Sequence, residues 1–204
     1  IQRGLEDRSV ACMLPLMHDD IRKMRAIKDA EEIELMRHAQ SITDAAFEHI
    51  VRYMRPGMME RQVQLELEEF MLRHGAQGLA FPSIVATGPN GASPHAIPGA
   101  TMLEAGQCVV LDFGACSYGY CSDMKRTVAV GIPSDEMRSV YQTVLNAQLA
   151  GIAAAKAGVT GERVDAAARK VISDAGYGDY FGHSFGHSLG LDIHENPIAA
   201  PGVH

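Results

Sequence analysis

The sequence predicts an α+β fold made of two similar halves. Two pairs of amphipathic helices alternate with β-structure, and a β-hairpin separates the two pairs. When the sequence is shifted by 101 residues against itself, the glycines that end helices coincide, Gly57 with Gly158 and Gly75 with Gly176. Any two helix hairpins can share such glycines, but agreement along the whole pair favours an internal duplication.

The first helix pair has clear start and stop signals. Asp29 and Glu32 form a capping box, and apolar residues at helical spacing follow until Pro56-Gly57 ends the helix. A second helix is expected from about Glu60 to His74, with Gly75 as its cap. A short strand at residues 83–87 then leads into a long loop, GPNGASPHAIPG.

Residues 109–131 read as a β-hairpin that carries two acids. Asp112 ends the apolar first arm and Asp123 opens the returning arm, so pairing of the arms brings the two carboxylates together. Close carboxylates repel each other unless one is protonated or a cation lies between them. A polar turn is the alternative, but the three apolar residues before Asp112 favour a site.

The second half repeats the helical pattern and then becomes rich in histidine. Ser134 caps a helix to about Ala157, and another amphipathic helix ends at Gly176. The stretch FGHSFGHSLGLDIHENP follows and holds three histidines, His183, His187 and His194. Three histidines between glycines, in a chain with two candidate acid ligands, favour a functional site. His95, in the loop before the hairpin, is a fourth candidate.

Composition limits the classes of function. The chain is 47% hydrophobic, enough for a buried core, and no apolar run approaches the roughly 20 residues of a membrane helix. A net charge of -7 without a Lys/Arg cluster argues against a nucleic-acid partner. Four cysteines without disulfide spacing predict a reduced, cytoplasmic protein, and a structural zinc site at Cys116 and Cys121 is not favoured.

Three motifs together resemble a known family. LDFG, then GYCSDMKRT, then GHSLGLDIHENP are similar to the pita-bread metallopeptidases, which include the Xaa-Pro aminopeptidases, the prolidases and the methionine aminopeptidases. The stretches RAIKDAEEI and FPSIVATGPNGASPHA look more like the Xaa-Pro branch. The resemblance implies the pita-bread (creatinase/aminopeptidase) fold with a pseudo-two-fold internal repeat.

The resemblance also implies a site with two divalent metal ions, manganese first, with cobalt or zinc as alternatives. In the family, two Asp, one His and two Glu hold these ions, and the matching metal ligands here are Asp112, Asp123 and His187. His95 and His194 match histidines that contact the substrate or stabilise the intermediate, and His183 matches a further histidine of the site.

The implied function is a two-metal peptidase that cleaves between an N-terminal residue and proline, as an Xaa-Pro aminopeptidase or dipeptidase. Its partner is then a peptide with proline at the second position, with no membrane partner and a possible homodimer. Methionine aminopeptidase is the alternative enzyme, and a metal-poor peptide-binding module or an inactive fragment is the alternative of another class. A hydrolase that does not cleave peptides, like the creatine-cleaving relatives of this fold, fits less well.

Two departures from the family accompany the match. No acidic residue follows Glu195, so three of the five ligands are present, and the second hairpin that should carry the two glutamates is expected beyond the given sequence. Lys125 stands where many members have Thr, and we expect no effect on the metals. Residues 1–20 are expected to be a linker or the remnant of an N-terminal domain, and residues 21–204 a catalytic domain truncated at its C-terminal end.

Overall fold

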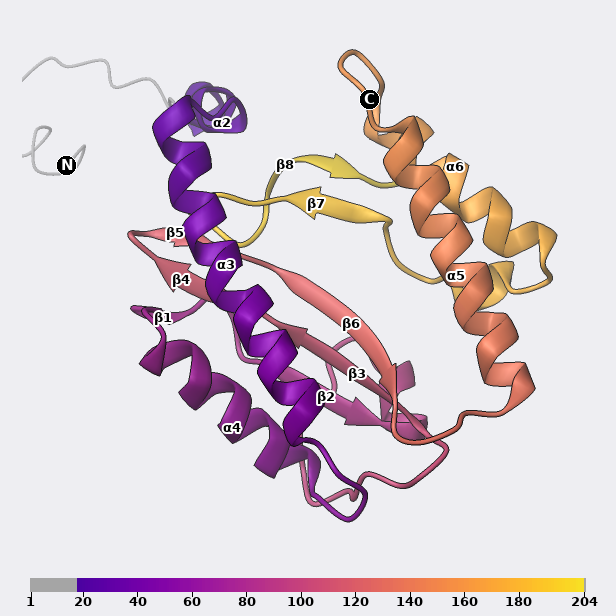
Figure 1. Ribbon diagram of the computed structural model, residues 1–204. Coiled ribbons are helices and arrows are strands. Elements are labelled where there is room, and N and C mark those ends of the chain that lie inside the picture. Colours follow the sequence, from indigo (N-terminus) through magenta and orange to yellow (C-terminus); the bar gives the residue numbers. More distant parts are fainter. Residues whose placement is uncertain (1–17, 204) are drawn as a thin grey trace, which may run out of the picture.

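The computed structural model describes residues 18–203, with side chains from Asp20 onward. Figure 1 shows two helix pairs, one on each side of a set of short strands. In chain order the elements are α2 (His18–Ala26), α3 (Ala30–Tyr53), α4 (Glu60–Arg73), β1 (Gly78–Leu79), β2 (Ile84–Thr87), η1 (Gly88–Ala92), β3 (Cys108–Phe113), β4 (Ala115–Ser117), β5 (Tyr120–Cys121), β6 (Met124–Ala129), α5 (Asp135–Ala154), α6 (Gly161–Asp174), η2 (Gly178–Tyr180), β7 (Gly186–Ser188) and β8 (Glu195–Ala199). Within residues 18–203, no helix combines the length and apolarity needed to cross a membrane.

The first half is a helix pair packed on an antiparallel sheet. The expected capping box is confirmed, because the Glu32 N–H donates to Asp29 and the Asp29 N–H donates to Glu32, at 2.9 and 2.8 Å. α3 and α4 cover one face of the sheet β2-β3-β6. The apolar residues that the helices and strands bring to this interface form the main core, including Ile50, Val63, Leu67, Leu111 and Phe113.

The hairpin covers nearly the predicted range, but each arm is divided into two strands and pairing continues closer to the turn than the sequence suggests. Its arms pair in one continuous register, from Cys108 opposite Ala129 to Ser117 opposite Tyr120. The ladder is interrupted at Gly114, where a Cβ atom would lie 2.0 Å from the Ser122 carbonyl oxygen. The expectation that Asp123 opens the returning strand is therefore corrected: Asp123 lies in this interruption, just before β6.

The internal repeat appears in the element boundaries. Shifted by 101 residues, α4 coincides with α6 at both ends, and the last residue of α3 coincides with the last residue of α5. Strand β7 then falls at the position of β2. The two predicted helix pairs are therefore confirmed, including the Ser134 cap, whose hydroxyl accepts the Met137 N–H at 3.2 Å.

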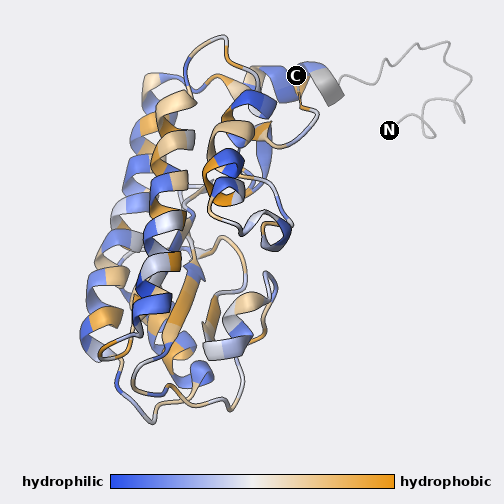
Figure 2. Cartoon of the chain, turned by 90° about the vertical axis from the view of Figure 1, so that its right-hand side faces the viewer, coloured by the Kyte–Doolittle hydropathy of each residue, from blue (hydrophilic) through white to orange (hydrophobic). Residues whose placement is uncertain are grey.

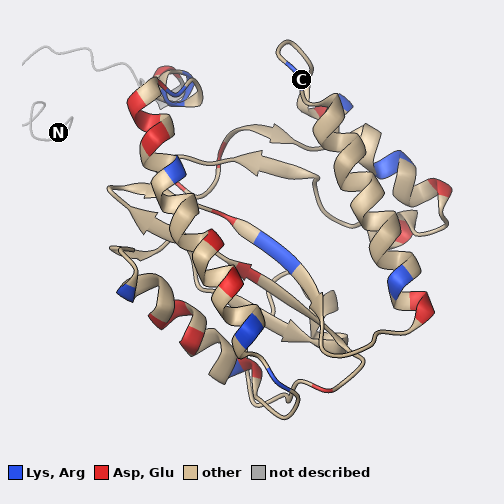
Figure 3. Cartoon of the chain, in the orientation of Figure 1, with Lys and Arg blue, Asp and Glu red and all other residues tan. Residues whose placement is uncertain are grey.

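The second helix pair has a much smaller core than the first. Ala147, Ala168 and Ile172 are buried between α5 and α6, whereas Tyr141, Val144 and Ile152 of α5 are about half exposed. Figure 2 shows apolar residues along the central strands and mixed surfaces on the helices. In the part of the chain that the structure describes, Lys and Arg are spread over several elements, as Figure 3 shows.

We expect Leu67→Ala to lower the free energy of unfolding by about 2–5 kcal/mol, because Leu67 is fully buried and truncation leaves a cavity. Leu72→Ala, on the same helix but 49% exposed, should cost less than about 0.5 kcal/mol. Urea unfolding of both variants measures the difference. Equal costs would contradict the assignment of the core.

Candidate metal centre

The register of the hairpin places Asp112 and Asp123 on the same face. Asp112 is paired with Lys125, so Asp123, two residues before Lys125, is its diagonal neighbour across the ladder. Side chains at diagonal positions lie on one face, with Cα atoms about 7–8 Å apart. Antiparallel pairing therefore brings the two predicted acids together.

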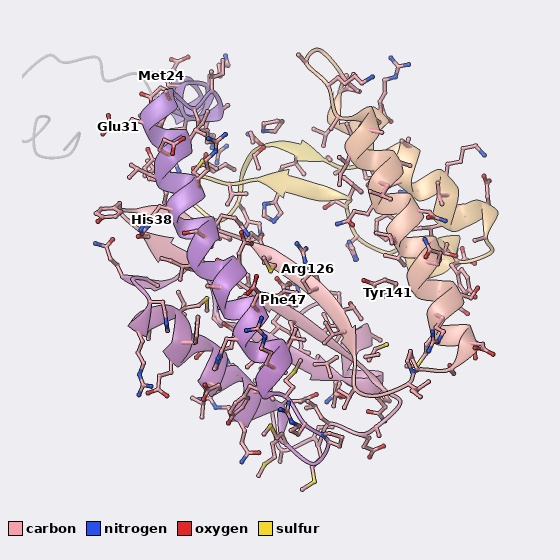
Figure 4. All side chains as sticks on the ribbon, in the orientation of Figure 1. Met24, Glu31, His38, Phe47, Arg126 and Tyr141 are labelled. Carbon is pink, nitrogen blue, oxygen red and sulfur yellow. The ribbon has the colours of Figure 1, made fainter. Side chains whose placement is uncertain are left out.

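These acids point away from α3 and α4. Along β3 the side chains alternate, and Leu111 faces the core while Asp112 faces the other side. Arg126 is paired with Leu111, and its guanidinium lies 5.9 Å from the ring centroid of Phe47 on α3. Figure 4 shows Phe47 and Arg126 beside each other. The acids consequently face the side of the sheet that α3 does not cover.

The surroundings of the two acids favour a cation. The Lys125 ammonium lies 3.0 Å from Asp112 Oδ2. Burial raises the pKa of Asp123, and the negative charge of Asp112 raises it further, against the opposite effects of His187, His194 and Lys125. A bound cation would relieve this repulsion and keep both carboxylates ionised.

His187 meets the acids from the second half of the chain. Its Nδ1 lies 3.0 Å from the Ser188 carbonyl oxygen, which fixes this nitrogen as the protonated one. The other ring nitrogen, Nε2, lies 3.5 Å from Asp123 Oδ2. In a neutral imidazole whose proton is on Nδ1, the lone pair of Nε2 would point beside this carboxylate, the arrangement that a metal-ligating histidine requires.

His194 lies next to His187, with ring centroids 4.4 Å apart. Its neighbour Glu195 is 7% exposed in its side chain and accepts hydrogen bonds from Arg25, from Lys28 at 2.9 Å and from the Asp192 N–H at 3.0 Å. The sequence analysis noted Glu195 only as the last acidic residue of the given sequence. Its ion pairs with residues more than 160 positions away have no signal in the sequence.

His95 and His183 are exposed on separate loops, and among the described residues we find no hydrogen bond or ring contact from either to the other four site residues. Glu60, which is 1% exposed, holds both ends of the loop that carries His95. Glu60 accepts hydrogen bonds from the Thr87 N–H at 2.8 Å and the Gly99 N–H at 3.2 Å, at the two ends of the loop. The sequence analysis missed Glu60, because it looks like an ordinary acid of a first helical turn.

The donor atoms fit divalent metal ions in kind. Two carboxylates and a neutral imidazole are ligands that manganese, cobalt and zinc accept in proteins. Within residues 20–203, however, no group of three or more His, Cys, Asp or Glu side chains is arranged so that it could hold an ion as it stands. Asp112, Asp123 and His187 would hold the ions, and further ligands would complete the shell.

Comparison with known proteins identifies the family of the chain. Residues 34–203 match the model of metallopeptidase family M24. The chain belongs to this family. Membership in M24 implies divalent metal ions, which supports the coarser part of the predicted cofactor.

Two relatives of the chain are named as peptidases. The chain is 48% identical over 179 residues to an uncharacterised peptidase of Bacillus subtilis, covering 88% of this chain and 51% of the relative. It is 42% identical to the Xaa-Pro dipeptidase of Pyrococcus furiosus, with the same two coverages. The chain therefore spans about half the length of these curated relatives.

Solved structures confirm the predicted pita-bread fold. An Xaa-Pro dipeptidase from Bacillus anthracis matches with a TM-score of 0.88 and 49% identity, covering 90% of this chain and 52% of that one. An X-Pro aminopeptidase from Thermotoga maritima matches with a TM-score of 0.88 and 43% identity, covering 91% and 53%. The fold of this M24 chain is thus the one that its motifs predicted.

We expect Glu195→Gln to lower the free energy of unfolding at pH 7 by about 1.5–3 kcal/mol, because charged hydrogen bonds are lost. Burial alone would raise the pKa of Glu195, but the Asp192 N–H, Lys28 and Arg25 outweigh burial and lower the pKa from 4.5 to about 2. The stabilisation is therefore present above pH 4.5 and is lost as the pH falls toward 2.

Urea unfolding of wild type and variant at pH 7 and pH 3 measures this effect. The difference between the two proteins should be smaller at pH 3. Glu34→Gln, which alters an exposed pair with Arg37, is the control and should change stability little at either pH. A difference for Glu195→Gln that stays constant with pH would contradict the ion-pair assignment.

Proposed function

We propose that the full-length protein is a metal-dependent peptidase that hydrolyses the bond between an N-terminal residue and proline. The observation that carries this proposal is the meeting of Asp112, Asp123 and His187, which come from the two halves of the chain, beside His194. The names of M24 relatives, Xaa-Pro dipeptidase and prolidase, support the substrate class.

Each site residue has a proposed role. Asp112 and Asp123 supply negative oxygen donors, and His187 supplies Nε2. When bound, the metal ions would lower the pKa of a water molecule and polarise the peptide carbonyl. His194, next to His187, is placed to donate a hydrogen bond to the oxyanion that develops from the carbonyl oxygen.

The finer features of the cofactor and partners are also proposals. We propose two ions, with manganese as the native metal because carboxylate oxygens suit it. His95 and His183 are proposed to reach the substrate from their exposed loops. We further propose a cytoplasmic protein with a peptide as its only substrate class, no nucleic-acid partner and a homodimeric state. Sedimentation at several protein concentrations tests the last point.

Two assays distinguish the alternatives. Release of the N-terminal residue from Xaa-Pro peptides, compared with release of Met from Met-Ala peptides, separates the proposed activity from that of a methionine aminopeptidase. The intact mass of the natural protein shows whether it reaches the length of its relatives, and sequencing of its C-terminal part shows whether it carries two further glutamates. A natural protein that takes up neither manganese nor zinc would instead support a peptide-binding module.

We expect Asp123→Ala to remove most of the Mn²⁺ uptake and, with it, the peptidase activity, because Asp123 lies between Asp112 and His187 in the proposed shell. Metal analysis after dialysis and cleavage of an Xaa-Pro peptide measure the two effects. Asp44→Ala, which removes an exposed acid of α3, is the control and should retain both. Full turnover by Asp123→Ala would overturn the ligand assignment.

For His194→Ala, in contrast, we expect the metal to be retained while turnover falls about 100-fold or more, as for loss of an oxyanion donor. Mn²⁺ content and kcat on the same peptide measure it. Loss of the metal together with activity would make His194 a ligand rather than a hydrogen-bond donor to the substrate.

A further inference from the structure

A partly buried ion pair on α6 is not part of the candidate metal centre. Asp165 is 1% exposed and binds Arg169, one helical turn later, through both carboxylate oxygens. Arg169 Nε lies 2.7 Å from Oδ2, and Nη2 lies 3.0 Å from Oδ1. Two parallel hydrogen bonds fix the plane of the guanidinium group.

Both members of the pair hold the backbone of residues 181–185. Arg169 donates from Nη1 to the Phe181 carbonyl and from Nη2 to the His183 carbonyl, each at 2.7 Å. The Phe185 N–H donates to Asp165 Oδ1 at 2.9 Å. The Arg169 guanidinium also lies 4.3 Å from the ring centroid of Phe181. Three backbone groups of one short segment are thus held by a single ion pair.

Lys170, the next residue along α6, forms an exposed ion pair that serves as a comparison. Lys170 and Asp174 have the same spacing but are 73% and 64% exposed, and Asp174 is the partner that the structure gives to Lys170. Burying two charges is costly unless their remaining donors and acceptors are satisfied. For Asp165 and Arg169, the satisfied groups are those of residues 181–185, so the burial serves that segment.

The Phe185 side chain is held from a second direction. Its ring lies against α5 at Gly151, where a Cβ atom would be 2.3 Å from the Phe185 ring. Gly151 is buried, and the absence of its side chain makes room for the ring. Phe185 is therefore fixed by its backbone N–H on α6 and by its ring on α5.

His187 follows Phe185 by two residues, in the middle of β7. On its other side, the Gly190 carbonyl accepts a hydrogen bond from the Cys121 N–H at 2.8 Å, which docks the segment on the hairpin that carries Asp123. His187 thus lies between an anchor on the hairpin and an anchor on α6. β7 is also paired with β8, with His187 opposite Ile198, so the two anchors fix the ends of a segment that the ladder holds in the middle.

We propose that Asp165 and Arg169 are positioning residues that hold His187 opposite Asp123. This role rests on the proposed function as far as His187 is a metal ligand. The geometric part, that the pair sets the place of the His187 ring, stands without it. Supporting groups behind a ligand commonly change metal affinity by about 10–100-fold when removed.

The test compares Arg169→Met, Arg169→Lys and Asp165→Asn with Lys170→Met. The last variant removes an exposed ion pair one residue away and is the matched control. Circular dichroism establishes that each variant is folded. Mn²⁺ titration followed by electron paramagnetic resonance gives the affinity, and the nuclear Overhauser effect between the His187 and His194 rings reports their placement, since their centroids are 4.4 Å apart.

In folded Arg169→Met we expect Mn²⁺ binding to weaken about 10–100-fold and the ring-to-ring effect to be lost. Amide exchange at Phe185 should also become faster, because its acceptor loses its partner. Arg169→Lys keeps the positive charge but loses the planar guanidinium group that binds through two nitrogens. It should give Mn²⁺ affinity and ring placement between those of wild type and Arg169→Met. Lys170→Met should match wild type. A role in stability alone would lower the unfolding temperature without changing affinity or ring placement in the folded protein.

Wild-type affinity and ring placement in folded Arg169→Met or Asp165→Asn would overturn the proposal. If Arg169→Met does not fold, Arg169→Lys and Asp165→Asn decide it by the same measurements. If the wild type itself takes up no Mn²⁺, the proposed function fails. The ring-to-ring effect and the exchange of Phe185 then still decide the positioning role.

Discussion

The pairing register of the hairpin is the constraint on which the candidate site depends. Because Asp112 lies opposite Lys125, Asp123 must lie diagonally across from Asp112 on the same face. A slip of one residue in one arm would turn that arm's acid toward the α3 and α4 core. The core residues Leu111 and Phe113 alternate with Asp112 along β3. The strand orientation that packs these two residues in the core therefore also directs Asp112 to the opposite face.

The positions of the histidines depend on hydrogen bonds to carboxylates rather than on the register of the hairpin. Three buried carboxylates hold the segments that carry them: Glu60 behind the loop of His95, Glu195 beside His194, and Asp165 behind the segment before His187. Each accepts at least one backbone N–H, so each fixes main chain in addition to the side chains that it binds. Glycine-rich segments have few side chains with which to anchor themselves. Glu60 and Asp165 hold such segments from elsewhere in the chain, whereas Glu195 lies in the segment of His194 and binds the distant Arg25 and Lys28.

The two halves of the chain share a plan but not a role. The first half supplies the acids from a hairpin that packs on the main core, and the second half supplies His187 from the short strand β7 and His194 from the turn just before β8. The site therefore forms only where the halves meet. The 101-residue repeat accounts for the equivalent positions at which the helices of the two halves end. After the helices the two halves contribute different groups to the site, acids from the first half and histidines from the second.

The sequence by itself determined the elements and the chemistry. Capping at Asp29 and Ser134, helix-ending glycines and alternation before Asp112 are local signals. The spacing of three motifs identified the family and predicted its donor residues. Only the tertiary structure decided which groups support them, such as the pairing of Arg25 with Glu195. Burial and contacts between distant residues leave no local pattern, because any acid in a helix or loop looks the same in sequence whether it is solvated or enclosed.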